Sequence, residues 1–136
     1  MLILDKDNII YSSGISYTIY NHFTKDKKVL FSKDKGGIAA IAVHPSKKYF
    51  AVAEKGVWPR IYIYEYPSLK LYRVMRRGTE KSFSSISFSH SGDMLASVGS
   101  NPDYMLNVWD WKQEQTILRA KAFSQEVYRV TFSQFN

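Results

Sequence analysis

The sequence predicts an all-β fold made of repeated four-stranded units, and three observations lead to it. Aromatic residues make up 15% of the 136 residues, and aromatic side chains favour strands over helices. Residues Ile41 to Tyr66 match the sequence 45 positions further on without a gap. A period of about 44 residues in strand-rich sequence is typical of β-propellers, in which each unit forms one blade. We therefore expect an incomplete propeller of about three four-stranded blades plus the first strand of another.

Fainter copies extend the repeat in both directions. Tyr20-Asn21 precedes Tyr64-Glu65 by 44 positions, and Val130 to Ser133 follows Ile86 to Ser89 at the same offset. The expected units are roughly residues 1–35, 36–81 and 82–124, followed by a strand within 125–136. Because a propeller needs four or more blades to close, we expect either a longer natural chain or another copy or partner that covers the open edges.

The second unit shows the strand pattern most clearly. Apolar and aromatic runs are separated by a turn at His44 to Lys48, where Pro45 fixes φ, and by a loop at Glu54 to Arg60 that contains a Gly and a Pro. The last run carries most of the basic charge, as expected of an outer strand that faces solvent. The expected strands are Ile38–Val43, Tyr49–Ala53, Ile61–Tyr66 and Leu69–Met75.

The third unit repeats this scheme. His90-Ser91-Gly92-Asp93 is expected to form a hairpin turn, since a catalytic triad needs its three groups to converge from separate elements. Val127 to Ser133 is expected to begin a further blade. The expected strands of the unit are Phe83–Ser89, Met94–Val98, Tyr104–Trp111 and Thr116–Lys121.

The composition excludes several classes of protein. There is no Cys, which rules out disulfides, Cys-based zinc sites and thiol catalysis and fits a reducing cytosolic compartment. The longest apolar run, Ile38 to Val43, is far too short for a membrane span, and Met1 to Asp5 lacks the features of a signal peptide. The His residues are scattered, and the sequence has no phosphate-binding loop and no paired carboxylates on one strand. We expect no catalytic, cofactor-binding or metal-binding residues, no membrane contact and no enzyme activity.

The net charge of +7 is concentrated in the middle of the chain. Residues 36–81 contain nine basic and three acidic residues, whereas residues 82–136 are close to neutral. Such a segment either attracts an acidic partner or serves as a solvated strand that keeps a β-rich protein soluble. Tyr66 and Tyr72 beside Arg73 could stack nucleic-acid bases, but aromatics of a propeller more often pack within blades, and no nucleic-acid partner is expected.

The third unit resembles the WD-repeat family. Ser97 lies on the second strand of the unit, and Asp103 precedes Trp109 by six residues, as in the signature of that family. The resemblance implies that these three side chains form a hydrogen-bonded structural set. The His that normally completes the set is missing, because Arg77 to Glu80 occupies its place. In the second unit Trp58 stands where the turn Asp is expected.

A narrower resemblance covers most of the chain from Gly36 onward. The strings Ala53 to Gly56 and Ser97 to Asp103 are not general WD-repeat strings, and they are similar to a family of axonemal proteins of cilia and flagella. This resemblance implies a structural scaffold of the tether and tether-head complex, which positions inner-arm dynein motor heads on the doublet microtubule. Its implied partners are the axonemal dynein arm, tether and tether-head subunits and the microtubule doublet. The alternative is a general WD-repeat adaptor in another cytosolic complex.

Five residues are candidate contacts for a protein partner. Trp58 lies in a loop where a large aromatic has no obvious role within a blade, and it either anchors a partner or covers the top of its own blade. Arg60 stands beside it in the same loop, and the arginines of the basic middle segment supply the charge that an acidic partner would meet. The candidates are Trp58, Arg60, Arg73, Arg76 and Arg77.

Overall fold

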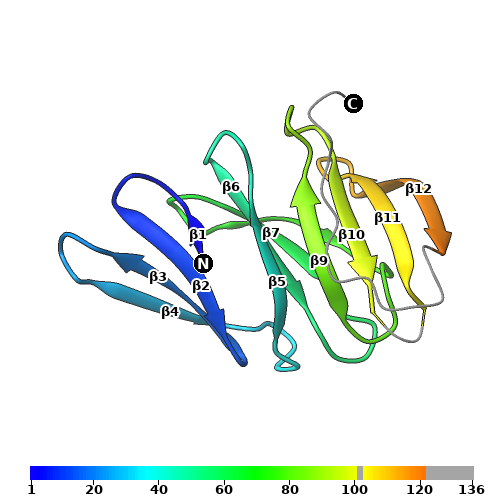
Figure 1. The fold of residues 1–136 in the computed structure, drawn as a ribbon, viewed down its shortest axis with the longest axis horizontal. Helices are drawn as coiled ribbons and strands as arrows, with labels where there is room; N and C mark the ends of the chain where they lie inside the picture. Colours follow the sequence, from blue (N-terminus) through cyan, green and yellow to red (C-terminus); the bar gives the residue numbers. More distant parts are fainter. Residues whose placement is uncertain (101–102, 122–136) are drawn as a thin grey trace.

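In the computed structural model of the chain, residues 1–100 and 103–121 are described, and their strands form three four-stranded antiparallel sheets (Figure 1). Sheet one contains β1 (Leu2–Ile3), β2 (Asn8–Ser13), β3 (Ser16–Asn21) and β4 (Lys27–Phe31). Sheet two contains β5 (Ile38–Val43), β6 (Tyr49–Glu54), β7 (Ile61–Glu65) and β8 (Leu71–Met75). Sheet three contains β9 (Phe83–Phe88), β10 (Leu95–Gly99), β11 (Met105–Asp110) and β12 (Gln115–Lys121).

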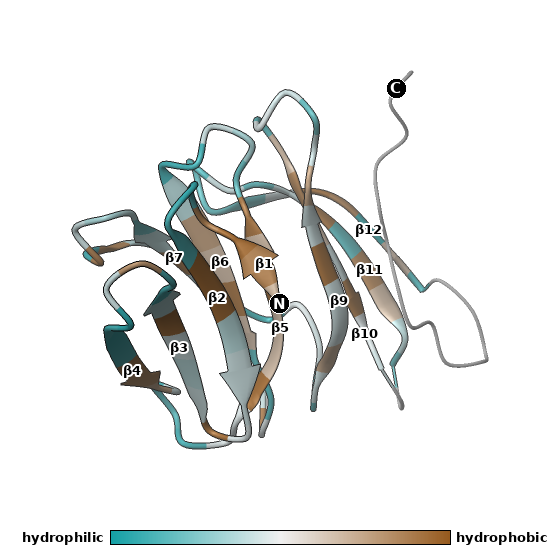
Figure 2. Cartoon of the chain, turned by 60° about the vertical axis from the view of Figure 1, so that its left-hand side comes forward, coloured by the Kyte–Doolittle hydropathy of each residue, from teal (hydrophilic) through white to brown (hydrophobic). Residues whose placement is uncertain are grey.

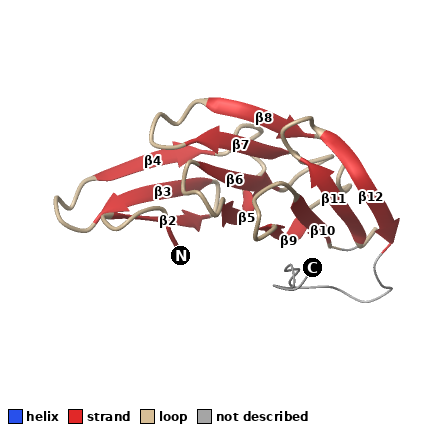
Figure 3. Cartoon of the chain, turned by 90° about the horizontal axis from the view of Figure 1, so that it is seen from above, coloured by secondary structure: helices blue, strands red, loops and turns tan. Residues whose placement is uncertain are grey.

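The strands of each sheet follow one another in chain order, so that successive strands of a sheet are joined as antiparallel hairpins. The sheets lie side by side in an arc, with β4, β8 and β12 along one rim and β5 and β9 along the other (Figure 3). Strand β5 lies beside β9 on one side and beside β2 on the other. The prediction of an all-β, incomplete propeller is therefore confirmed, while its expected last strand, within 125–136, lies outside the described residues.

Two apolar clusters form the core, and each lies between neighbouring sheets. One joins sheets one and two and contains fully buried Ile10 and Phe50, and the other joins sheets two and three and contains fully buried Ile63 and Trp111. Sheet two contributes to both clusters because its strands are apolar on both faces, and hydrophobic residues run through β5 and β6 at the centre of the arc (Figure 2). Most of the hydrophobic stabilisation thus comes from the packing of sheet against sheet.

Strands β8 and β11 begin later than the sequence suggests, for the same reason. Leu69 and Tyr104 both have positive φ, at 63° and 48°, which a strand does not accommodate. The N–H of Leu69 donates to the Glu65 carbonyl at 2.8 Å, and this closes the turn before β8. Strands β8 and β11 therefore start at Leu71 and Met105.

Sheet one, whose strands the sequence left undefined, is tied to sheet two by a polar contact. The Asp5 carboxylate accepts the backbone N–H groups of Asp7 and Asn8, both at 2.8 Å, and so forms the turn between β1 and β2. The hydroxyl of Tyr66 donates to the same carboxylate at 2.7 Å. This contact fixes the end of sheet one against the β7–β8 connection.

The described part of the chain contains no helix that is long and apolar enough to cross a membrane.

Candidate functional site

The structure brings two of the three predicted WD-type residues together in sheet three. The indole N–H of Trp109 on β11 donates to the hydroxyl of Ser97 on β10 at 3.0 Å. Both side chains are buried, so the bond satisfies an indole N–H that has no access to water. The contact fixes the Trp109 ring over the strand beside it.

Asp103, the third residue of the set, holds the loop that precedes β9. Its carboxylate accepts the Thr79 hydroxyl at 2.9 Å and the Glu80 N–H at 2.8 Å. It also accepts the N–H of Met105 at 3.2 Å, which caps the start of β11. Thr79 is fully buried and takes the contact for which the WD-repeat pattern uses a His. Thr79 was not among the predicted residues of the set, although its place in Arg77 to Glu80, where the His is missing, was the available signal.

Sheet two uses a different carboxylate for the same task. Glu54, at the end of β6, is 1% exposed and accepts the N–H groups of Lys33 and Asp34 at 2.7 and 3.1 Å. Gly99 occupies the corresponding position in sheet three, 45 residues later. A Cβ there would lie 2.7 Å from the Thr79 Cβ and 2.8 Å from Asp103 Oδ1. Sheets two and three therefore each hold the loop before them with one acidic side chain. In sheet two it is Glu54 at the end of a strand, and in sheet three it is Asp103 in the following turn.

We expect Ser97→Ala to lower the free energy of unfolding by about 1–3 kcal/mol, because it leaves the buried indole N–H of Trp109 without an acceptor. Urea unfolding of the chain measures this change. Trp109→Phe has no such N–H, so in that background the same Ser97→Ala change should cost clearly less. Equal costs in both backgrounds would show that the hydrogen bond contributes nothing to stability.

Glu54 gives the fold a defined dependence on pH. Burial raises the pKa of Glu54 above its ordinary value of 4.5, and the Lys33 and Asp34 N–H groups only partly oppose that effect. A raised pKa means that the folded chain binds this proton more tightly than the unfolded chain. The contribution of Glu54 to stability is then fully present below pH 4.5 and declines as pH rises through the raised pKa.

We therefore expect the difference in unfolding free energy between the parent chain and Glu54→Gln to be larger at low pH than at pH 7. Urea titrations of both proteins between about pH 4 and 7 measure that difference, and the other titrating groups cancel in it. A difference that grows with pH would mean that the two N–H donors lower the pKa of Glu54 by more than burial raises it.

Four of the five candidate contact residues line one pocket. Trp58, Arg60, Arg76 and Arg77 surround a space of about 230 Å³. They come from the β6–β7 loop and from the segment that follows β8, so the loop and the end of the outer strand meet here. The lining contains three guanidinium groups and no carboxylate. The arrangement can hold an anionic group beside an aromatic ring.

The fifth candidate, Arg73, lies elsewhere and is already engaged. Its Nε donates to the Lys112 carbonyl at 2.7 Å, and its guanidinium lies 4.2 Å from the centre of the Tyr72 ring. Beside it, the Val74 N–H donates to the Glu114 carboxylate at 3.0 Å. Arg73 thus connects β8 to the β11–β12 turn.

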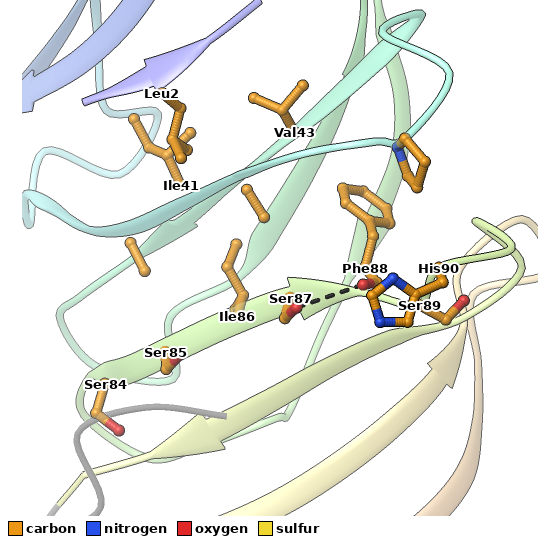
Figure 4. Close-up of a pocket in the computed structure, with 13 residues that line it drawn as sticks. Leu2, Ile41, Val43, Ser84, Ser85, Ile86, Ser87, Phe88, Ser89 and His90 are labelled. Carbon is orange, nitrogen blue, oxygen red and sulfur yellow. Dashed lines mark hydrogen bonds between the residues drawn. The ribbon is translucent and has the colours of Figure 1, made fainter. Parts of the chain in front are cut away.

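A cavity of about 440 Å³ lies between β5 and β9 (Figure 4). Apolar side chains such as Ile41 and Val43 come from β5, while β9 contributes Ile86, Phe88 and a run of serines. The hydroxyl of Ser87 donates to the Phe88 carbonyl at 3.3 Å. The cavity is the space between the inner strands of neighbouring sheets. Across the described residues there is no group of three or more His, Asp or Glu side chains that could hold a metal ion.

Comparison with known proteins gives matches in sequence and in structure. The chain is 50% identical to "Cilia- and flagella-associated protein 44" of Mus musculus over 98% of its length, and 42% identical to the protein of the same name from Chlamydomonas reinhardtii over 99%. It spans only 7% and 8% of the length of these relatives. The crystal structure of the RRP9 WD40 repeats superposes with a TM-score of 0.78 at 17% identity, covering 95% of this chain and 39% of that one. No protein-family model matches the sequence.

Proposed function

Since the chain has the fold of the WD40-repeat propellers and is similar over nearly its whole length to a segment of cilia- and flagella-associated protein 44, we propose that it is a non-enzymatic scaffold segment of the ciliary or flagellar axoneme. Within the axoneme it is part of the tether and tether-head complex that positions inner-arm dynein motor heads on the doublet microtubule. In that place it supports the motility of the cilium or flagellum.

The observation that carries this proposal is the sequence identity of 50% to a relative whose name places it in cilia and flagella. The names of the relatives support a location in the cilium or flagellum. The chain spans less than a tenth of each relative, so the activity and partners of the whole protein belong to the proposal.

The polar chemistry of the described residues supports a scaffold. Buried carboxylates and hydroxyls serve to fix loops and strands, as Glu54 and Ser97 do. WD-repeat propellers present loop surfaces and strand edges to protein partners, because rigid blades hold those surfaces in place. The proposed partners are a dynein arm, tether-head subunits and the doublet microtubule.

The experiment is to tag the full-length protein in a ciliated or flagellated cell and to cross-link isolated axonemes. We expect the tag in the axoneme and cross-links from residues of this segment to an inner-arm dynein heavy chain, to tether-head subunits or to tubulin. A tag confined to the cell body, with cross-links to other cytosolic proteins, would contradict the proposal and would favour a general WD-repeat adaptor.

A further inference from the structure

We propose that the pocket formed by Trp58, Arg60, Arg76 and Arg77 binds an acidic peptide segment of a protein partner, with carboxylates on the arginines and a side chain against the Trp58 ring. This rests on the proposed role of the chain as a protein-binding scaffold. It adds the site of contact and the chemistry of the partner to that role.

The backbone holds Trp58 in an exposed and unusual position. Its φ is 51°, a left-handed conformation that costs free energy for a residue other than Gly, and its side chain is 45% exposed. The Trp58 N–H donates to the Glu80 carbonyl at 2.8 Å, and the Gly56 N–H donates to the Lys81 carbonyl at 2.7 Å. The loop is thereby fixed to the segment that leads into β9, so little conformational entropy is lost when a partner contacts the ring.

The cations of the pocket are positioned but not neutralised. The carbonyl of Arg77 accepts a hydrogen bond from the Arg119 guanidinium at 2.8 Å, and the Arg77 side chain lies over the Trp58 ring at 5.9 Å. Arg76 and Arg77 are both exposed, and neither guanidinium is hydrogen-bonded to a carboxylate among the described residues. Arginine binds carboxylates through two parallel hydrogen bonds, and Trp and Arg are the residues that contribute most to protein interfaces.

The size of the pocket favours a peptide over nucleic acid. Single-stranded nucleic acid is bound along a continuous basic groove with several aromatic platforms, one for each of several bases. Here one Trp and three arginines surround a space of about 230 Å³. Tyr72 and Arg73 lie outside the pocket lining and contact each other, so they offer no second platform.

The experiment measures binding of a fluorescein-labelled ten-residue polyglutamate peptide to the purified chain by fluorescence anisotropy at low salt. We expect Arg76→Glu to weaken binding at least tenfold. Lys70→Glu is the matched control, because Lys70 is also exposed, lies in the β7–β8 connection and is outside the pocket lining. The substitution changes the net charge by the same amount as Arg76→Glu. It should weaken binding less than threefold.

A second readout uses the intrinsic fluorescence of Trp58, because Trp109 and Trp111 are buried. Peptide binding should shift the tryptophan emission of the parent chain, and the shift should disappear in Trp58→Phe. This variant keeps an aromatic ring, and its thermal unfolding checks that it folds.

Three outcomes would overturn the proposal: no binding of polyglutamate, equal weakening by Arg76→Glu and Lys70→Glu, or tighter and equally Arg76-dependent binding of a ten-nucleotide oligothymidine. Because the assay contains no axonemal protein, its failure leaves the axonemal location untouched. A cell-body location in the tagging experiment would, conversely, leave the peptide binding intact.

Discussion

Trp111→Ala is expected to lower the free energy of unfolding by about 3–5 kcal/mol, because it removes a large buried side chain from between two sheets. Trp111 is fully buried, and its ring lies edge-on to those of His44, Tyr49 and Phe88 at 5.2–5.6 Å. Its indole N–H also donates to the Gly92 carbonyl at 2.9 Å. Loss of the ring leaves a cavity that His44 and Tyr49 of sheet two and Phe88 of sheet three cannot fill without moving the sheets.

Urea unfolding followed by circular dichroism measures this change. Trp111→Phe keeps part of the ring volume and should cost less than Trp111→Ala. Leu118→Ala is the surface control, since Leu118 is 51% exposed and its loss should change stability by less than about 0.5 kcal/mol. If Trp111→Ala cost no more than the Leu118 control, packing between sheets two and three would not be a source of stability.

Gly92→Ala is expected to lower the free energy of unfolding by about 2 kcal/mol or more, for two reasons that act together. Gly92 has a φ of 83°, which an Ala adopts only with strain. An added Cβ would also collide with the His44 ring, whose Nε2 lies 2.9 Å from the Gly92 carbonyl. The ring would have to move and give up that contact between sheets two and three.

Gly14→Ala separates the two causes. Gly14 also has a positive φ, at 61°, but nothing lies within 4 Å of the position of its missing Cβ. Its replacement therefore costs only the backbone strain, about 1 kcal/mol. Equal losses at the two glycines would show that the His44 ring moves aside freely.

The sequence predicts the second and third sheets well, and the reason is their periodicity. Ile38–Val43 is a strand with the expected bounds, because its apolar run ends at a His-Pro turn that no strand can continue through. The faint repeat in residues 1–35 gave no strands, since β1 has only two residues and the turn after it depends on Asp5. Alternation of side chains does not reveal a turn formed by one carboxylate.

The candidate site is less visible in the sequence, because its contacts join distant segments. Trp58 and the arginines can be recognised in the sequence as candidate contacts. Only the fold shows that Arg76 and Trp58 line one pocket, whereas Arg73 donates to the Lys112 carbonyl. The structural role of Glu54 was not predicted for the same reason. Its partners are the backbone N–H groups of Lys33 and Asp34, which precede it by about twenty residues. Backbone donors have no signature in the sequence.

Sheet two holds the loop before it with Glu54, and sheet three does so with Asp103. This difference restricts how the sequences of the repeats can diverge. A Glu at position 99 would collide with Thr79 and Asp103 and would place two carboxylates side by side. Loss of Glu54 would leave two N–H groups without the acceptor that they have now. Converting one arrangement into the other takes at least two substitutions, and a chain that carries only one of them would be destabilised. A change at position 54 should therefore be accompanied by a change at position 58, and a change at position 99 by one at position 103. In related sequences each sheet should then keep the acidic residue that it uses here.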